Sequence, residues 1–101
     1  MKVLKIEPES GFRLLAGTGR AQAATLVLPS GGSTGGPDNR HAGSDQWLYV
    51  ISGEGLAVVE GEEHRIGGGS LLLIEAGEAH EISNSGDGPL ETLNIYSPPE
   101  Y

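Results

Sequence analysis

The stretch QWLYVIS, residues 46–52, decides the fold class, because its aromatic and β-branched residues are typical of a β-strand. Successive side chains of a strand point to opposite faces, so the stretch presents two different surfaces. One face carries Gln46, Leu48 and Val50, and the other carries Trp47, Tyr49 and Ile51. A glycine turn at residues 53–55 follows, and we predict that residues 47–52 and 56–60 form a β-hairpin across it.

Short apolar runs separated by turn residues continue on both sides of this strand. Seventeen glycines and six prolines supply the turns, and no stretch shows the period of a helix. We predict an all-β fold of eight or nine strands, closed as a barrel or sandwich. The predicted strands are residues 3–6, ended by Pro8, and residues 12–15, 22–28, 47–52, 56–60, 64–66, 71–74, 80–84 and 92–96.

Length and charge restrict the partners of the chain. The 101 residues fit one domain, residues 1–101, and the formal net charge of −8 repels nucleic acid and anionic lipid. Cysteine is absent, so neither a disulfide framework nor a thiolate metal site is expected. The N-terminal residues include Lys2, Lys5 and Glu7 and contain no long apolar run. We therefore expect a cytoplasmic protein that binds neither nucleic acid nor membranes.

Two histidines lie at positions that favour a shared site. His41 lies in a polar loop just before the 46–52 strand, and His80 opens a later strand. If Gln46 and His80 both face the interior of a barrel, then Asn39, His41, Gln46 and His80 converge near its mouth. That convergence would place a set of nitrogen and oxygen donors around an apolar cavity.

Two sets of spaced residues surround these histidines. The first set is Ser33, Asn39, His41, Gln46 and Gly53, and the second is Gly69, Glu75, Gly77, His80 and Asn84. Their spacing resembles the two motifs of small single-domain cupins, and the resemblance covers nearly the whole chain. It implies a double-stranded β-helix, or jelly-roll, barrel. As a sign of function it is weak, since this fold hosts many chemistries.

The resemblance also implies a metal site. Metal-binding cupins hold the ion with three histidines and one glutamate, and here Asn39 and Gln46 stand at two of those four positions. Amides bring no charge, so affinity should be lower than in a site with the full set. We expect Asn39, His41, Gln46 and His80 to be the candidate ligands. A divalent transition metal (Zn, Ni, Fe, Cu or Mn) suits neutral imidazoles better than Mg or Ca does. The alternative, which is equally open, is that His41 and His80 are polar residues of the barrel mouth that hold no metal.

Other ionisable residues nearby have simpler interpretations. Asp45 points away from Gln46 in this register, and only a β-bulge would turn it inward. Glu75, Glu78 and Glu81 are expected to be solvated charges on the rim. His64 lies among charged neighbours and is expected at the surface.

The outward set Trp47, Tyr49 and Ile51 needs a partner of its own. Either the N-terminal strand or Phe12 covers it, or it forms the interface of a homodimer, as aromatic residues often do. For function, we expect an oxygenase-like or isomerase-like cupin that acts on a small organic molecule. The alternative is a non-catalytic cupin that binds a small ligand, such as a sugar or a phenolic compound, without metal. The sequence leaves open whether the protein is an enzyme.

Overall fold

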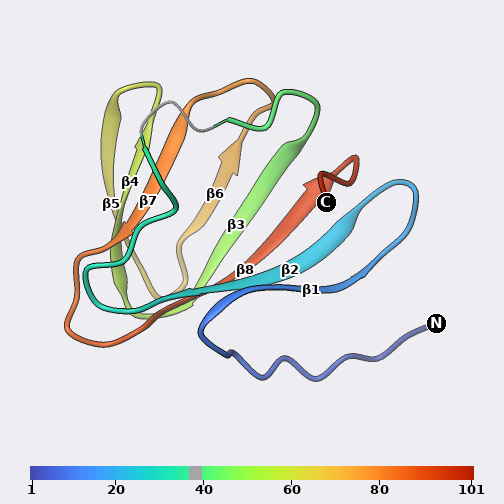
Figure 1. The fold of residues 1–101 in the computed structure, drawn as a ribbon, viewed down its shortest axis with the longest axis horizontal. Helices are drawn as coiled ribbons and strands as arrows, with labels where there is room; N and C mark the ends of the chain where they lie inside the picture. The colour runs from blue at the N-terminus through green and yellow to red at the C-terminus, as the bar shows by residue number, and fades with distance from the viewer. Residues whose placement is uncertain (37–39) are drawn as a thin grey trace.

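A computed structural model describes residues 1–36 and 40–101, and these residues form strands and loops without helix (Figure 1). Within those ranges, no helix has the length and apolarity needed to cross a membrane. The described part of the chain has eight strands, which are β1 (Gly11–Gly17), β2 (Gln22–Leu28), β3 (Asp45–Ser52), β4 (Glu54–Val59), β5 (Glu62–Gly67), β6 (Leu71–Ile74), β7 (His80–Asn84) and β8 (Leu90–Ser97).

The strands form two antiparallel sheets. One has the order β1-β2-β8-β3-β6 and the other has the order β5-β4-β7. Figure 1 shows β5, β4 and β7 together on one side and the longer strands β3, β8 and β2 opposite them. This arrangement confirms the all-β class and the jelly-roll architecture expected from the sequence.

The core lies between the two sheets. Along β3 the side chains alternate as predicted, with Gln46, Leu48 and Val50 buried and their neighbours exposed. On β7, His80, Ile82 and Asn84 are buried in the same way. The apolar cluster between the sheets is made of Leu28, Leu48, Val50, Ala57, Ile66, Ile74, Ile82 and Leu90.

The predicted hairpin between residues 47–52 and 56–60 is wrong. β3 pairs with β6 and β8, whereas β4 pairs with β5 and β7, so the chain changes sheets between them. Gly53 makes this corner with a φ of +97°, a region that residues with a Cβ rarely adopt. A Cβ at Gly53 would also clash with the carbonyl oxygen of Pro89, which shows how closely the chain passes the loop before β8.

The predicted strand at residues 3–6 is also wrong. Residues 1–9 are in no strand, and Val3, Leu4 and Ile6 are exposed. A strand needs a hydrogen-bonding neighbour, and β1 occupies the edge of the large sheet instead. The remaining predicted strands are present, with ends that differ by a few residues.

The outer face of β3 and β6 stays uncovered. Trp47 and Tyr49 are each 42% exposed, and in the register of the two strands they lie opposite Leu73 and Leu71. The covers considered from the sequence are not in place, because residues 3–6 form no strand and the Phe12 ring packs against Tyr101, 4.7 Å between ring centroids.

Candidate functional site

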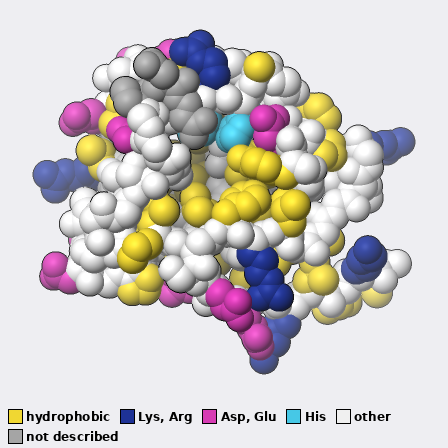
Figure 2. Space-filling model, in the orientation of Figure 1, with side chains coloured by type: hydrophobic (Ala, Val, Ile, Leu, Met, Phe, Trp, Pro, Cys, Tyr) yellow, Lys and Arg dark blue, Asp and Glu magenta, His cyan; other side chains and the backbone are white. Residues whose placement is uncertain are grey.

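A cavity of about 310 Å³ lies at one end of the barrel. In Figure 2 a band of hydrophobic side chains fills the middle of the face, and a histidine side chain lies at the edge of that band beside an acidic one. Asn39, the remaining predicted donor, lies outside the described residues. The cavity is lined by Phe12, Leu26, Leu28, Ser33, Thr34, His41, Gln46, Leu48, His80, Ile82, Tyr96 and Tyr101.

Gln46 enters the cavity from β3 with a defined orientation. Its Nε2 donates to Asn94 Oδ1 at 2.9 Å, Asn94 Nδ2 donates to Thr92 Oγ1 at 3.0 Å, and the Thr92 hydroxyl donates to the Leu26 carbonyl at 2.7 Å. Because the Leu26 carbonyl oxygen can only accept, the donor and the acceptor of all three hydrogen bonds are fixed. Gln46 Oε1 is left buried and without a partner, one of two such side-chain atoms in the described residues.

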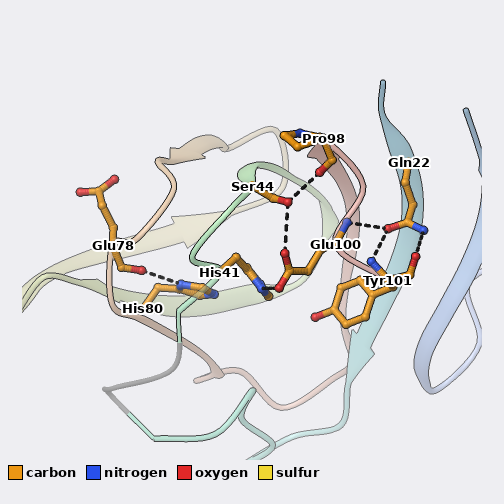
Figure 3. Close-up of polar contacts among 8 residues, drawn as sticks. All are labelled: Gln22, His41, Ser44, Glu78, His80, Pro98, Glu100 and Tyr101. Atoms are coloured by element: carbon orange, nitrogen blue, oxygen red, sulfur yellow. Dashed lines mark hydrogen bonds and ion pairs between the residues drawn. The ribbon is translucent and has the colours of Figure 1, made fainter. Parts of the chain in front are cut away.

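His80 begins β7, and only about 2% of it is exposed. Its Nδ1 lies 3.1 Å from the Glu78 carbonyl oxygen, which can only accept, so Nδ1 carries the proton (Figure 3). The other nitrogen, Nε2, then has a lone pair. Burial lowers the pKa of His80 below its ordinary value of 6.5, so the imidazole is neutral at pH 7.

His41 comes from the loop before β3, and its position is fixed from two sides. Its carbonyl oxygen accepts a hydrogen bond of 2.9 Å from the Gly77 amide, in the turn before β7. Its Nδ1 lies 3.2 Å from Glu100 Oε1, as Figure 3 shows. An ionised carboxylate can only accept, so Nδ1 carries a proton, and in the neutral form of the ring the lone pair is on Nε2. The His41 and His80 rings lie 4.9 Å apart, centroid to centroid.

The comparison with known families agrees with this architecture. Residues 24–96, from the middle of β2 to the inward-facing Tyr96 near the end of β8, match the family described as "Cupin domain". The chain belongs to the cupin family. The match includes His41, His80 and Gln46, and it ends before the tail that carries Glu100.

Individual proteins resemble the chain over parts of their length. The oxalate-binding protein of Thermotoga maritima is 33% identical over 71% of this chain, and TcmJ, a tetracenomycin polyketide synthase protein of Streptomyces glaucescens, is 34% identical over 60%. The chain spans only 58% and 41% of those two proteins. Among solved structures, a Bacillus halodurans protein superimposes with a TM-score of 0.86 at 26% identity, over 91% of this chain and 73% of that one.

Because many cupins bind a metal ion, the side chains of His41, His80 and Gln46 were compared with what an ion requires. Among the described residues, no group of three or more His, Cys, Asp or Glu side chains is arranged to hold one. However, the orphaned Gln46 Oε1 and the Nε2 atoms of His41 and His80 belong to three side chains that line one cavity. Two neutral imidazoles and one amide oxygen fit a divalent transition metal better than a hard ion. Both histidines also donate Nδ1–H to an oxygen, Glu100 Oε1 or the Glu78 carbonyl, as metal-binding histidines usually do.

Three residues of the site were not found from the sequence. Glu100, Tyr101 and Tyr96 come from the end of β8 and the tail after it. Tyr96 and Tyr101 lie edge-on to the His41 ring, with centroids 5.3 and 5.9 Å away. The signal for Tyr96 was present, because Thr92, Asn94 and Tyr96 alternate along β8 as an inward face does. Nothing local marks Glu100.

Asp45 and His64 lie outside the cavity, as expected from the sequence. Asp45 is exposed and accepts a hydrogen bond of 2.9 Å from the Ala76 amide, away from the cavity. The His64 side chain is 62% exposed and lies 3.7 Å from Glu62 in the outer strand β5. A larger groove of about 690 Å³ runs between the edge strands β5 and β6, but the His64 in its lining has no second histidine beside it. The barrel cavity is therefore the better candidate site.

Proposed function

We propose that the barrel cavity binds a divalent transition metal through His41, His80 and Gln46, with Asn39 as the fourth ligand, and presents it to a small organic molecule. The observation that supports this most is the orphaned Gln46 Oε1, 4% exposed as a residue and held in place by Asn94. Leaving a buried acceptor unpaired costs about 1–3 kcal/mol, and a bound cation removes that cost. Both histidines present lone pairs to the same cavity.

The residues of the cavity have different roles in this proposal. The metal, when bound, supplies Lewis acidity for an oxygenase-like or isomerase-like reaction. Leu26, Leu48 and Ile82 provide apolar walls that exclude water. Burial raises the pKa of Tyr96, so its hydroxyl keeps its proton and can donate a hydrogen bond to a ligand. At about 310 Å³ the cavity is at the lower end of the range for ligand pockets, which suits a small molecule.

The relatives support the class of function and no single substrate. The Thermotoga maritima relative is named for oxalate binding, and the Streptomyces glaucescens relative for a polyketide synthase. Both names concern small organic molecules. Since the chain spans about half of these proteins, their ligands come to this chain only as candidates for a screen.

A second candidate function is binding of a sugar or phenolic ligand without metal or catalysis. The observation that favours it is the aromatic wall made by Phe12, Tyr96 and Tyr101, whose rings pack against one another. Such rings stack on the flat faces of sugars and phenols. The unpaired acceptors of Gln46 and the histidines would then accept hydrogen bonds from ligand hydroxyls instead of ligating an ion.

Elemental analysis of protein purified without chelator separates the two functions. We expect near-stoichiometric Zn, Ni, Fe, Cu or Mn in the wild type, and its loss in His80→Ala, where one imidazole and two amides remain. His64→Ala, the matched control on the surface, keeps the metal. A turnover screen on small organic acids and phenols follows. A wild type that takes up no added metal but binds a sugar or phenol would replace the first function with the second.

Assembly is part of the same proposal. The exposed apolar patch on β3 and β6, defined by Trp47, Tyr49, Ile51, Leu71 and Leu73, is the interface of a homodimer. Clustered apolar side chains of this kind are uncommon on a monomer, and two-fold pairing of the patch would bury both copies of it.

A further inference from the structure

The tail after β8 is fastened across the cavity by side chains from other strands. Gln22, at the start of β2, accepts hydrogen bonds from the backbone amides of Glu100 (3.2 Å) and Tyr101 (2.9 Å) through Oε1. Its Nε2 donates to the Tyr101 carbonyl at 2.8 Å. Ser44 donates to the Pro98 carbonyl at 2.7 Å. These bonds hold the tail at both ends of the segment that carries the Glu100 side chain (Figure 3).

The Glu100 carboxylate is engaged at both oxygens. Oε2 lies 3.1 Å from Ser44 Oγ, and Oε1 lies 3.2 Å from His41 Nδ1. The His41 side chain is 10% exposed and that of Glu100 is 27% exposed, so the contact is partly shielded from water. A carboxylate held in this way has one oxygen fixed on the imidazole, and its charge lies beside a cavity whose described lining residues include no Asp or Glu.

We infer that Glu100 is the positioning residue of the site: it holds the proton of His41 on Nδ1, keeps the Nε2 lone pair available to the cavity, and supplies the negative charge that Gln46 lacks. The role of that lone pair as a metal ligand rests on the proposed function, whereas the position of the proton does not. Glu100 lies outside residues 24–96, the region that matches the cupin family.

The physical argument compares His41 with and without its partner. A neutral imidazole without a partner can carry its proton on either nitrogen. When Nε2 is protonated, it has no lone pair and donates a hydrogen bond into the cavity instead of accepting one. The carboxylate at Nδ1 removes that alternative, and it also makes the ring a stronger donor to a cation.

Nitrogen NMR of the metal-free protein tests the inference directly. The chain has three histidines, so the ring nitrogens of His41 are assigned by comparison with single variants. The spectrum is recorded at a pH where the ring nitrogens show the neutral form, so that it reports which nitrogen is protonated. We expect a protonated Nδ1 for His41 in the wild type and a mixture in Glu100→Ala. Glu100→Gln, which keeps an acceptor oxygen, should restore the wild-type pattern in part.

Glu91 offers a matched control. It lies at the other end of β8, and its Oε1 accepts a hydrogen bond of 3.0 Å from Ser52, whereas Glu100 shares the single hydroxyl proton of Ser44 with the Pro98 carbonyl. Glu91→Ala removes the same charge and a similar hydrogen bond but should leave the His41 nitrogens unchanged. A wild-type His41 protonated on Nε2, or a Glu100→Ala spectrum equal to that of the wild type, would overturn the inference.

Metal titration then separates this inference from the proposed function. Loss of a partner that orients a metal ligand typically weakens metal affinity 10–100-fold, and we expect a loss of that order for Zn²⁺ in Glu100→Ala but none in Glu91→Ala. Equal Zn²⁺ affinity in the wild type and Glu100→Ala would overturn the part of the inference that concerns the ion. If the wild type binds no Zn²⁺, the proposed metal function fails, and the nitrogen spectrum alone decides the role of Glu100.

Discussion

Gln46 Nε2 donates to Asn94 Oδ1 at 2.9 Å, and this single bond determines which atom of the Gln46 amide faces the cavity. Asn94 is fully buried and has its own amide committed to Thr92, so it can offer Gln46 only an oxygen. The strand register makes this contact diagonal, because Gln46 lies opposite Tyr96 and Leu48 lies opposite Asn94. The amide oxygen of Gln46 is therefore presented to the cavity by Asn94 and Thr92, which do not line it.

The substitution Gln46→Glu tests whether this amide oxygen is a metal ligand. A carboxylate at position 46 brings the charge that suits a cation, so we expect tighter metal binding than in the wild type. Without metal, one carboxylate oxygen meets Asn94 Oδ1 with no proton between them, and we expect a loss of about 1–3 kcal/mol in the free energy of unfolding. Competition titration measures the first change and urea unfolding the second. Unchanged metal affinity would mean that Gln46 is not a ligand.

Gly53 tests the corner that connects the two sheets. Gly53→Ala forces a Cβ into a φ of +97° and against the Pro89 carbonyl, so we expect the free energy of unfolding to fall by about 2–3 kcal/mol. Gly88→Ala is the control in the neighbouring loop, where a Cβ has no atom within 4 Å, and it should change stability by less than about 1 kcal/mol. Equal effects in urea unfolding would show that the corner is not tightly packed.

Tyr96 gives the protein a pH dependence at high pH. Burial, followed by the neighbouring Tyr101, raises the pKa of Tyr96 above the ordinary value of 10. Above pH 10 the unfolded chain loses this proton while the folded chain keeps it. The free energy of unfolding should therefore fall as pH rises, by up to about 1.4 kcal/mol per pH unit. Tyr96→Phe should show a shallower fall, and phenolate absorbance should lose its highest-titrating group. The same slope in both proteins would contradict the assignment.

Much of the fold was predictable because it depends on local alternation. Gln46, Leu48 and Val50 could be placed on one face from the sequence, since a strand with one buried side repeats every two residues. The partner of that strand could not, because the glycine turn after Ser52 fits a hairpin as well as a corner. Packing of Gly53 against Pro89, far along the chain, selects the corner.

The candidate site divides in the same way. His41, Gln46 and His80 were recognised from motif spacing, and they line one cavity. Glu100 was not recognised, because its contact with His41 depends on how Gln22 and Ser44 fasten the tail. The contact between His41 and Glu100 forms only when the tail lies across the barrel, so no local sequence pattern predicts it.

The proposed homodimer interface is the apolar patch on β3 and β6. Tyr49 lies in the middle of it, paired in register with Leu71 on one side and Leu93 on the other. Tyr49→Glu would place a charge in an apolar contact, so we expect sedimentation to give twice the chain mass for the wild type and a shift toward monomer for the variant. Leu14→Glu, which changes an exposed apolar residue on β1, should remain dimeric. A wild type that stays monomeric at high concentration would rule out this interface, because dilution could not then explain the absence of the pair.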